Sequence, residues 1–538
     1  MTESIASPST SLPIMGMATS MAVIVLTGTL VMRRSCSFWW STDKNRKGDT
    51  PPHARFWIPY VGAGLAMGQK GLLGFVRSTA RDLARKDGTM RVDGKGDRAV
   101  VATYPSVFTA TVLGDACLFF ADPADLMIVF GARYQKYLDV LSLQKQFVKN
   151  ALGATPQDVT ETFQHEMTRL GTSQYHHYLF KGQELERSMQ HVQKFFLDWI
   201  PKVAHHGTWK EQKLYEFVGT AIFHASTGPL MSQAVPQSDD AYTNFIDFDK
   251  GVIALFNNVP SFFLSSAVKA RDKLLQMVRS KEYWNLASPL MKERKNVLLH
   301  KHLSESSMAR ANLGLLWASS GNSIPAVFWL VVRLLEDPVA WQACLTQVKG
   351  IMAKRKTNSI NKDEVHAGFT LEELDEMTLL ESAFYESLRM YQANVTARKV
   401  VQGFALETSN GGTYWIPEGT KLMAVWSVLH MDPHVHERPE EFRYDRFVDK
   451  GKRYAFANGE ILKHDSVIPF GGGSHLCPGR KFISYEARLF CAMLMTNLEF
   501  RLPDNFQRPN IDLTLQGIGV SQPTHDPIVE IRLATNLI

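Results

Sequence analysis

A glycine-rich loop holds the side chain of this sequence that is best suited to bind a metal. The loop runs from Phe470 to Arg480 and carries one cysteine, Cys477, just before a segment with helical apolar spacing. A thiolate that ligates a haem iron must stay ionised and shielded from water, with backbone N–H groups directed at its sulfur. Glycines permit positive φ and a close approach to a flat macrocycle, and the N-terminus of the next helix favours an anion. The loop therefore predicts a thiolate ligand.

The spacing within the loop decides between two interpretations of Cys477. An isolated free cysteine is more commonly a buried structural residue. Here Phe470, Gly473, Cys477 and Gly479 meet the pattern F-x-x-G-x-x-x-C-x-G, which resembles the ligand loop of the cytochrome P-450 family. The resemblance implies a mainly α fold with small β-sheets, and haem b with Cys477 as the axial ligand of its iron. The other three matched residues would belong to the haem site.

A charged cluster is expected beneath this loop. Glu386 and Arg389 are three residues apart and share one face of a predicted helix. Alone they are a weak signal, because exposed pairs of this kind are common and contribute little. The segment Glu441–Phe447 resembles the family's second basic motif. The resemblance implies that Arg446 completes a structural Glu-Arg-Arg cluster.

The segment Met308–Asp337 is apolar nearly all round and predicts a buried central helix. Pro325 lies inside it, lacks the N–H that would bond to the carbonyl of Gly321, and opens that turn with its ring. We therefore expect a distortion at Gly321, Asn322 and Ser323. An opened turn with small and polar residues is a place where a diatomic ligand and a water could lie against a haem.

Two positions in this turn depart from the family pattern. Most oxygenases of the family carry an acid followed by a threonine there, and the pair delivers protons to dioxygen. This chain has Gly321 and Asn322 instead. An amide can donate a hydrogen bond but is a poor link in a proton chain. Hydroxyl groups at Ser319, Ser320 and Ser323, or ordered water, would have to help.

The haem propionates have two candidate partners. The family's Trp-x-x-x-Arg motif is not visible in the sequence. His475 stands in the ligand loop where arginine is more usual, and Arg398 follows Arg389 by nine residues. Each could also be a plain surface or turn residue.

Further segments resemble one branch of the family, which contains sterol 7-alpha-hydroxylases, sterol 12-alpha-hydroxylases and prostacyclin synthase. These segments are Phe248–Lys250, Ala270-Arg271 with Lys273-Leu274, Trp317–Ala326 with Phe328-Trp329, and Cys477–Arg480. The branch implies a bulky apolar substrate such as a sterol, a terpenoid or a related secondary metabolite.

Three functions are compatible with these features. The first is a monooxygenase that uses dioxygen and electrons from NADPH, supplied by a separate flavoprotein reductase because no G-x-G-x-x-G follows a strand here. The second is a reductase-independent isomerase of a lipid peroxide or endoperoxide, as in prostacyclin synthase. The third is an inactive sterol-binding membrane protein. The intact loop and the residues Glu386, Arg389 and Arg446 argue against the third function.

The N-terminal region predicts a membrane anchor. Residues 12–32 carry no charge and as a helix would span roughly 30 Å, the thickness of a bilayer core. Basic and aromatic residues follow at 33–47 and place that end in the cytoplasm. A cleaved signal peptide is the rival, but its charges would precede the apolar run. We expect residues 1–11 in the lumen, 12–32 as a single anchor, 33–56 as a basic, Pro-rich linker, and 57–538 as the cytosolic catalytic domain. The family resemblance implies that the membrane is that of the endoplasmic reticulum.

A second contact with lipid is suggested by residues 252–264. Two apolar stretches, Val252–Phe256 and Ser261–Leu264, bracket Asn257–Pro260. Burial in the core is the commoner fate of such residues. Two helices joined by an apolar loop also fit the membrane-dipping substrate entrance of the family.

Composition excludes some other classes of function. The net charge is +6 without a long Lys/Arg run, so nucleic acid is not indicated as a partner. The five cysteines are scattered without a C-x-x-C pair, which indicates a reducing compartment and argues against structural zinc.

Several smaller elements are also predicted. Strands are expected at Val107–Val112 and Cys117–Phe120 around a Gly114-Asp115 turn. The residues 414–416 and 422–426 resemble the family's strand-turn-strand. Thr370–Glu373 and Thr378–Glu381 have capping-box spacing and should each begin a helix.

Overall fold

The computed structural model describes residues 49–56, 62–86, 105–112, 114–129, 131–163, 175, 177–300, 303–358, 368–393, 395–471, 476–517 and 519–535. The predicted lumenal segment 1–11, the anchor 12–32 and most of the linker 33–56 lie outside these residues. The chain divides into two compact units. Unit 1 comprises the described residues within 1–139 and 397–424, and unit 2 those within 140–396 and 425–538.

Unit 1 is built on a β-sheet with strand order β1-β2-β3-β9-β6-β4 and a separate hairpin of β7 and β8. Its elements are β1 (His53–Ala54), α2 (Gly62–Lys86), β2 (Val107–Val112), β3 (Asp115–Phe120), α3 (Pro123–Val129), α4 (Ala132–Gln135), β4 (Leu138–Asp139), β6 (Val395–Val400), β7 (Phe404–Glu407), β8 (Thr413–Ile416) and β9 (Lys421–Val425).

The hairpin of β2 and β3 confirms the two predicted strands. They pair antiparallel from Val107↔Phe120 to Val112↔Asp115, and Gly114 takes a φ of 92° in the turn. Phe108 and Phe119 stack side by side with ring centroids 5.4 Å apart, and Phe75 of α2 meets Phe119 edge-on. The predicted strand-turn-strand is observed only in part, because β8 pairs with β7 whereas β9 pairs with β3.

Unit 2 is mainly helical. Its elements are α5 (Leu141–Asn150), α6 (Pro156–Thr162), α8 (Gln183–Val203), β5 (Lys210–Lys213), α9 (Leu214–Leu230), α10 (Ala241–Phe256), η1 (Ser261–Leu264), α11 (Ser265–Arg279), α12 (Lys281–Asn285), α13 (Pro289–His300), α14 (Glu305–Ser320), α15 (Ser323–Glu336), α16 (Pro338–Asn358), α17 (Leu371–Glu376), α18 (Thr378–Tyr391), α19 (Ser427–His430), η3 (Lys450–Tyr454), α20 (Arg480–Asn497), β10 (Leu498–Arg501), η5 (Leu513–Leu515) and β11 (Ile528–Leu533). The strands form a small sheet in the order β10-β11-β5.

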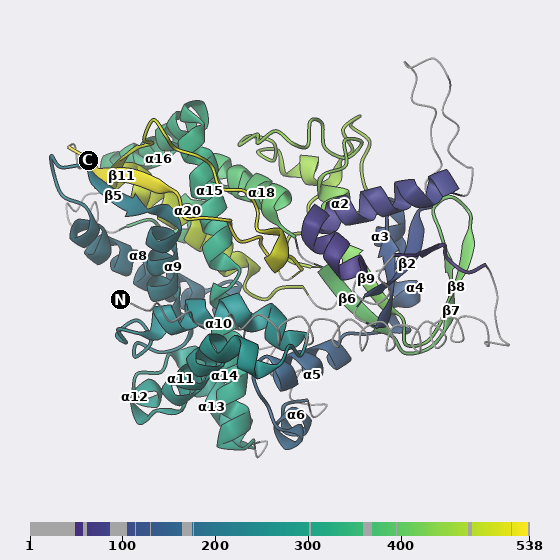
Figure 1. Ribbon diagram of the computed structural model, residues 1–538. Coiled ribbons are helices and arrows are strands. Elements are labelled where there is room, and N and C mark those ends of the chain that lie inside the picture. The colour runs from purple at the N-terminus through teal and green to yellow at the C-terminus, as the bar shows by residue number, and fades with distance from the viewer. Residues whose placement is uncertain are drawn as a thin grey trace, which may run out of the picture. The chain divides into compact units, whose positions relative to one another are not determined.

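The core of unit 2 lies around α15, α18 and α20, which pack against one another (Figure 1). Trp329 of α15 stacks flat on Tyr391 of α18 with a centroid distance of 4.0 Å, and its indole N–H donates to the carbonyl of Ser521 at 2.7 Å. Every residue of α20 from Phe482 to Thr496 is buried. A helix that is apolar or paired on all sides in this way belongs to the interior of a large domain.

The central helix is interrupted where Pro325 predicts it. Helix α14 ends at Ser320 and α15 begins at Ser323, with Gly321 and Asn322 between them. Among the described residues, the stretch Glu305–Glu336 is the one helical segment long and apolar enough to cross a membrane, and more than half of it is buried inside the protein. Burial of this kind is the property of a core helix.

One of the two predicted capping boxes is confirmed. The Thr370 side chain accepts from the Glu373 N–H, and the Glu373 carboxylate accepts from the Thr370 N–H, at the start of α17. Helix α18 begins at Thr378 as predicted, but the capping box predicted there is wrong, because Met377 is the N-cap and makes no side-chain cap. The Thr378 hydroxyl instead accepts from Gln347 of α16 at 3.0 Å, so a tertiary contact has replaced the local one.

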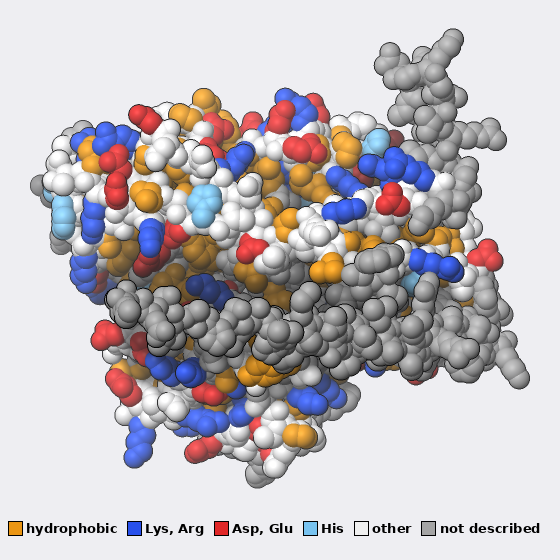
Figure 2. Space-filling view, in the orientation of Figure 1, with side chains coloured by type: hydrophobic (Ala, Val, Ile, Leu, Met, Phe, Trp, Pro, Cys, Tyr) orange, Lys and Arg blue, Asp and Glu red, His pale blue; other side chains and the backbone are white. Residues whose placement is uncertain are grey.

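The surface carries charges of both signs. On the face shown in Figure 2, Lys and Arg side chains are interspersed with Asp and Glu side chains. Exposed ion pairs such as Lys194–Asp198 and Lys354–Glu376 belong to this pattern. Pairs of this kind contribute little to stability.

Candidate functional site

The described part of the glycine-rich loop turns back on itself around Cys477. The Cys477 N–H donates to the carbonyl of Phe470 at 2.9 Å, which closes the loop at its two ends. Gly471 has a φ of 74°, a conformation that glycine adopts without cost. Helix α20 begins at Arg480, as the apolar spacing predicts. Gly473 and His475 lie outside the described residues, so their predicted contacts with haem remain predictions.

Cys477 differs from the other described cysteines. Cys117, Cys344 and Cys491 are buried, whereas Cys477 is partly exposed. Burial raises the pKa of the Cys477 thiol above its ordinary value, and the backbone N–H group of Gly479, the Arg480 charge and the Arg480 N–H group oppose this shift. Amides aimed at sulfur from a helix start stabilise a thiolate.

The Glu-Arg-Arg cluster is formed by the three residues that the sequence predicts. Arg389 donates to both oxygens of Glu386 at 2.8 and 2.9 Å, and Arg446 Nε donates to the same two oxygens at 2.9 Å. Glu386 and Arg389 are completely buried. The remaining N–H groups of Arg446 donate to the carbonyls of Glu437, Arg438 and Glu441. A buried ion pair is tolerated only when its remaining groups are satisfied in this way.

The cluster is connected to the segment that precedes the ligand loop. Arg389 donates to the carbonyl of His430 at 2.9 Å, and the His430 Nε2 accepts from the N–H of Ile468 at 3.0 Å. Burial lowers the pKa of His430 well below its ordinary value, with His436 and Arg389 adding to the effect, so the imidazole is neutral and its Nε2 can accept. Gln392 also donates to the carbonyl of Pro469. The cluster thereby fixes the backbone immediately before Phe470.

On the central helix, the polar side chains near the break are largely engaged by backbone groups. Ser323 donates to the carbonyl of Ser319 at 2.7 Å, and Ser319 donates to that of Leu316 at 3.0 Å. The Asn322 Oδ1 accepts from the N–H of Val520 at 3.2 Å. Ser320 is buried, and its hydroxyl has no partner among the described residues.

The contact between Asn322 and the 517–520 segment requires glycine. Gly519 has a φ of 71°, and a Cβ there would lie only 1.5 Å from the Asn322 Oδ1. The same segment exchanges backbone hydrogen bonds with the end of α18: Ala393 donates to Gly519, and Gly517 donates to Ala393. The C-terminal stretch therefore determines the orientation of the Asn322 amide.

Sequence reasoning assigned no role to Asp249. Trp317 donates from Nε1 to the Asp249 Oδ1 at 2.8 Å, and Asp249 lies beside Gly321. The signal in the sequence is a carboxylate that follows the buried Phe248 in the largely apolar helix α10.

Arg398 lies on β6 in unit 1. Its Nη1 donates to the carbonyl of Ala397 at 2.9 Å. Burial lowers the pKa of its guanidinium, and the charge of Asp139 opposes this shift. Its contact with a haem propionate remains a prediction.

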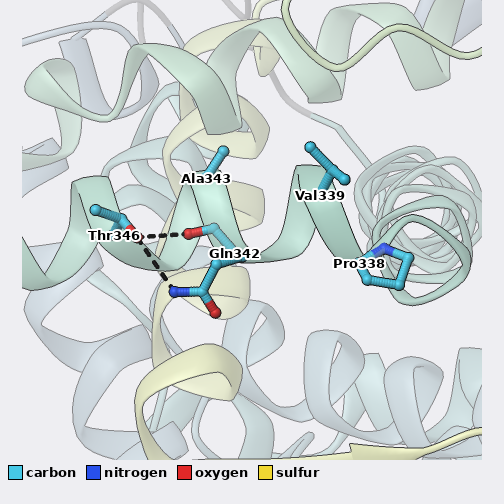
Figure 3. A pocket seen from close by; sticks show the side chains of 5 residues that line it. All are labelled: Pro338, Val339, Gln342, Ala343 and Thr346. Carbon is cyan, nitrogen blue, oxygen red and sulfur yellow. Dashed lines mark hydrogen bonds between the residues drawn. The ribbon is translucent and has the colours of Figure 1, made fainter.

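A surface depression on α16 contains none of the predicted site residues. It is lined by Pro338, Val339, Gln342, Ala343 and Thr346 (Figure 3). Gln342 and Thr346 bond to each other along the helix. This depression is a groove along one helix and carries no group suited to chemistry.

Comparison with known proteins identifies the family. Residues 143–529 match the family described as cytochrome P450. The chain belongs to the cytochrome P450 family. It is 26% identical to cytochrome P450 7A1 of Rattus norvegicus, over 94% of this chain and 98% of that protein. It is also 26% identical to the cholesterol 7-alpha-monooxygenase of Cricetulus griseus, over the same shares of the two chains.

Two further comparisons agree with this assignment. The chain is 27% identical to the 7-alpha-hydroxycholest-4-en-3-one 12-alpha-hydroxylase of Homo sapiens, over 60% of this chain and 67% of that protein. The solved structure of retinoic acid bound cyanobacterial CYP120A1 superposes with a TM-score of 0.64 at 18% identity, over 91% of this chain and all of the other. The mainly helical cytochrome P450 fold with small sheets is thus confirmed, as is the branch predicted from the sequence.

As a cytochrome P450 monooxygenase, the protein uses a haem with a cysteine thiolate ligand and electrons that a reductase supplies from NADPH. The described residues fit this cofactor: Cys477 is the one described cysteine that is open, and backbone N–H groups approach its sulfur. A thiolate ligand adds electron density to the iron and favours cleavage of the O–O bond.

Proposed function

We propose that this cytochrome P450 is a membrane-bound monooxygenase that hydroxylates a sterol or a related polycyclic lipid. The similarity over nearly the full chain to a cholesterol 7-alpha-monooxygenase carries the proposal. The similarity to a 12-alpha-hydroxylase of a sterol ketone supports the same class of substrate. A terpenoid or another bulky secondary metabolite belongs to this chemical class.

In this reaction a C–H bond of the substrate and the O–O bond of dioxygen break, and an alcohol and water form. Two electrons come from NADPH through a flavoprotein reductase, and two protons come from solvent. The haem, when bound, supplies the activation of dioxygen. Cys477 holds the iron, and Glu386, Arg389 and Arg446 hold the loop that presents Cys477. The Asn322 amide, oriented by Val520, donates a hydrogen bond towards dioxygen.

A reductase-independent isomerase of a lipid peroxide or endoperoxide is the second candidate function. The observation in its favour is the pair Gly321 and Asn322, neither of which can pass on a proton. Such an isomerase rearranges an existing O–O bond and needs no proton delivery to dioxygen.

The membrane assignment rests on two segments. Residues 12–32 have the length and composition of an anchor of the endoplasmic reticulum membrane with the catalytic part in the cytosol. The second segment follows α10: Phe262 and Phe263 in η1 are 72% and 70% exposed, with ring centroids 4.0 Å apart. Paired aromatic rings in solvent are suited to the interface of a bilayer, where an apolar substrate is dissolved.

One experiment separates these functions. The full-length protein is purified, its carbon monoxide difference spectrum is recorded after reduction, and turnover of sterols is measured with reductase and NADPH and, separately, with a hydroperoxide alone. We expect a thiolate-type spectrum and a hydroxylated product that requires reductase. Turnover by hydroperoxide alone would support the isomerase, and a protein that takes up no haem would contradict both.

A second experiment tests the lipid contact. We expect the double variant Phe262→Ser/Phe263→Ser to show a KM several-fold higher for a sterol supplied in vesicles, and an unchanged KM for the same sterol in detergent. The exposed Val339 on α16 offers a control, since Val339→Ser should change neither value. Equal KM values in vesicles for the double variant and the wild type would argue against lipid contact at this loop.

A further inference from the structure

The space above Gly321 is filled by Trp317 of the same helix and by a carboxylate from a different helix. A Cβ at Gly321 would lie 3.2 Å from the Asp249 Oδ1 and 3.2 Å from the Trp317 Nε1. Asp249 comes from α10, whereas Gly321 lies at the end of α14. The carboxylate of Asp249 is therefore positioned against the backbone where most oxygenases of the family carry an acid on the central helix itself.

The contacts of Asp249 orient its carboxyl group. Its Oδ1 accepts the indole N–H of Trp317 at 2.8 Å, which fixes that oxygen. Its Oδ2 has a long contact of 3.4 Å with the Gln522 Nε2. Among the described residues, Oδ2 is thus the less strongly held oxygen.

Gln522 and the neighbouring Asp526 are held by two separate sets of polar contacts. The Tyr215 hydroxyl donates to the Gln522 Oε1, and the backbone N–H groups of Tyr215 and Glu216 donate to Asp526 at 2.6 and 2.9 Å. Glu216 is exposed. Because an amide is a poor proton carrier, Gln522 positions Asp249 and does not conduct protons, and solvent is the proton source.

We propose that Asp249 is the carboxyl group that holds protons and passes them to dioxygen at the break of the central helix, in place of an acid on that helix. In the hydroxylation, two electrons from NADPH and two protons reduce one atom of dioxygen to water, while the other enters the C–H bond. Asp249 transfers its proton and recovers another from solvent. This inference rests on the proposed oxygenase function.

The electrostatics of the site agree with this role. Burial raises the pKa of Asp249 to about 6, while the Trp317 N–H and the charge of Lys250 oppose the shift. Tyr215 and Asp526 are titratable groups beyond Gln522, and burial raises the pKa of each. A general acid works best when its pKa lies near the working pH.

The variant Asp249→Asn tests the proposal, because an amide can still accept from Trp317 but cannot release a proton. Asp247→Asn, two residues earlier on α10, is the matched control. With reductase, NADPH and sterol, we expect kcat of D249N to fall roughly 100-fold and the share of electrons recovered as hydrogen peroxide to rise several-fold. The sterol dissociation constant should not change, and D247N should resemble the wild type.

An infrared measurement provides a readout that does not depend on turnover. The stretching band of carbon monoxide on the reduced protein reports the local electric field, so we expect a shift in D249N and none in D247N. An unshifted band in D249N, together with an unchanged share of electrons recovered as hydrogen peroxide, would overturn the proposal. A higher sterol dissociation constant in D249N, with an unchanged share of electrons recovered as hydrogen peroxide, would also overturn the proposal. It would show that Asp249 contacts the substrate instead.

The two hypotheses fail in different ways. If the wild type turns over only with a hydroperoxide, the proposed oxygenase function fails. The infrared comparison of D249N with the wild type still decides whether Asp249 faces the bound carbon monoxide. If the wild type hydroxylates with reductase and D249N does so equally well, only the role of Asp249 is rejected.

Discussion

The two sides of the candidate site are built on different principles. On the thiolate side, Glu386 accepts from two arginines at once, and each guanidinium nitrogen that does not bond to Glu386 donates to a backbone carbonyl. On the opposite side, the helix is broken at Gly321 and Asn322, the Ser320 hydroxyl has no partner among the described residues, and Asp249 approaches from α10. The charges of the first side are paired with one another, whereas the second side is a helix opened at its break.

Under the proposed function, the difference corresponds to what each side has to do. A thiolate ligand must keep one position and one charge state, so a network of paired charges that fixes the loop serves it well. A side that handles dioxygen and protons needs groups that can change their hydrogen bonds during the reaction. Substitutions on the two sides should therefore have different effects. Those on the thiolate side should cause loss of haem or of folding, and those on the opposite side should uncouple oxygen reduction from product formation.

The largest effect is expected for Cys477→Ser. A serine hydroxyl is not an adequate substitute for a thiolate, so the thiolate-type carbon monoxide spectrum should be lost completely. Cys491→Ala on the same helix α20 is the control and should keep the spectrum, because Cys491 is a buried structural cysteine. A full thiolate spectrum in C477S would remove Cys477 as the ligand.

Next in size is Glu386→Gln. Removing the charge leaves two buried guanidinium groups uncompensated, which should cost about 3–5 kcal/mol of unfolding free energy and release haem at lower urea concentrations. Glu437→Gln is the control, because its carboxylate is exposed and lies 3.8 Å from Arg443. Its cost should stay below about 1 kcal/mol. Equal costs for E386Q and E437Q would contradict the paired description of the thiolate side.

A pH-dependent effect is expected at Glu486 of α20. Burial raises the pKa of Glu486 to about 8, and the Ser226 hydroxyl, which donates to its Oε1, opposes the shift. Between the ordinary carboxyl pKa and this value, the folded protein holds a proton that the unfolded chain has released. Stability should therefore fall as pH rises through that window, by roughly 1.4 kcal/mol per pH unit.

Glu486→Gln is neutral at every pH and should lack this slope. We expect its melting temperature to exceed that of the wild type by several degrees at pH 8 and to match it near pH 5. The exposed Glu282 supplies the control substitution Glu282→Gln, which should keep the wild-type slope. Parallel pH profiles for E486Q and the wild type would show that the buried carboxyl carries no such proton.

The smallest effect is expected at Gly519, on the open side. In Gly519→Ala the new Cβ meets the Asn322 Oδ1, and the positive φ adds strain of about 1–2 kcal/mol. In the Asn322→Ala background the steric conflict disappears and only the strain remains. The double-mutant cycle should therefore give an interaction free energy of about 1 kcal/mol between the two substitutions.

Gly517→Ala is the matched control for this cycle, since its φ is also positive but nothing lies within 4 Å of a Cβ there. Gly517→Ala should lower the free energy of unfolding by the same amount in the wild type and in the Asn322→Ala variant. Zero coupling for Gly519 would mean that Asn322 is not held by this segment. Asn322→Ala alone should raise the release of hydrogen peroxide if its amide orients dioxygen.

The thiolate side could be predicted from the sequence because its parts are contiguous motifs. The loop from Phe470 to Gly479 and the pair Glu386 and Arg389 are short patterns with fixed spacing, and Pro325 marks the helix break by its missing N–H. The role of Arg446 could be predicted only from the family resemblance, because nothing local indicates that it contacts Glu386, which lies 60 residues earlier in the chain.

The open side could not be predicted in the same way. Asp249 approaches Gly321 only through the packing of α10 on the central helix, and no local pattern encodes that contact. The capping box predicted at Thr378 failed for a related reason, since its hydroxyl accepts from Gln347 of another helix instead, although the helix begins at Thr378 as predicted. Tertiary contacts decided both cases. Gly473, His475 and the anchor 12–32 lie outside the described residues and stay predictions.

The turn at 517–520 has a consequence for how the protein is made. Val520 orients Asn322, and Gly517 and Gly519 bond to Ala393 at the end of α18, so residues near the C-terminus complete a structure begun 200 residues earlier. During synthesis the N-terminal parts emerge first, and this arrangement cannot close in the nascent chain until residues 517–520 have been added. The side proposed to handle oxygen should therefore form after the thiolate side, and a chain truncated before Gly517 should be able to bind haem without being able to use it.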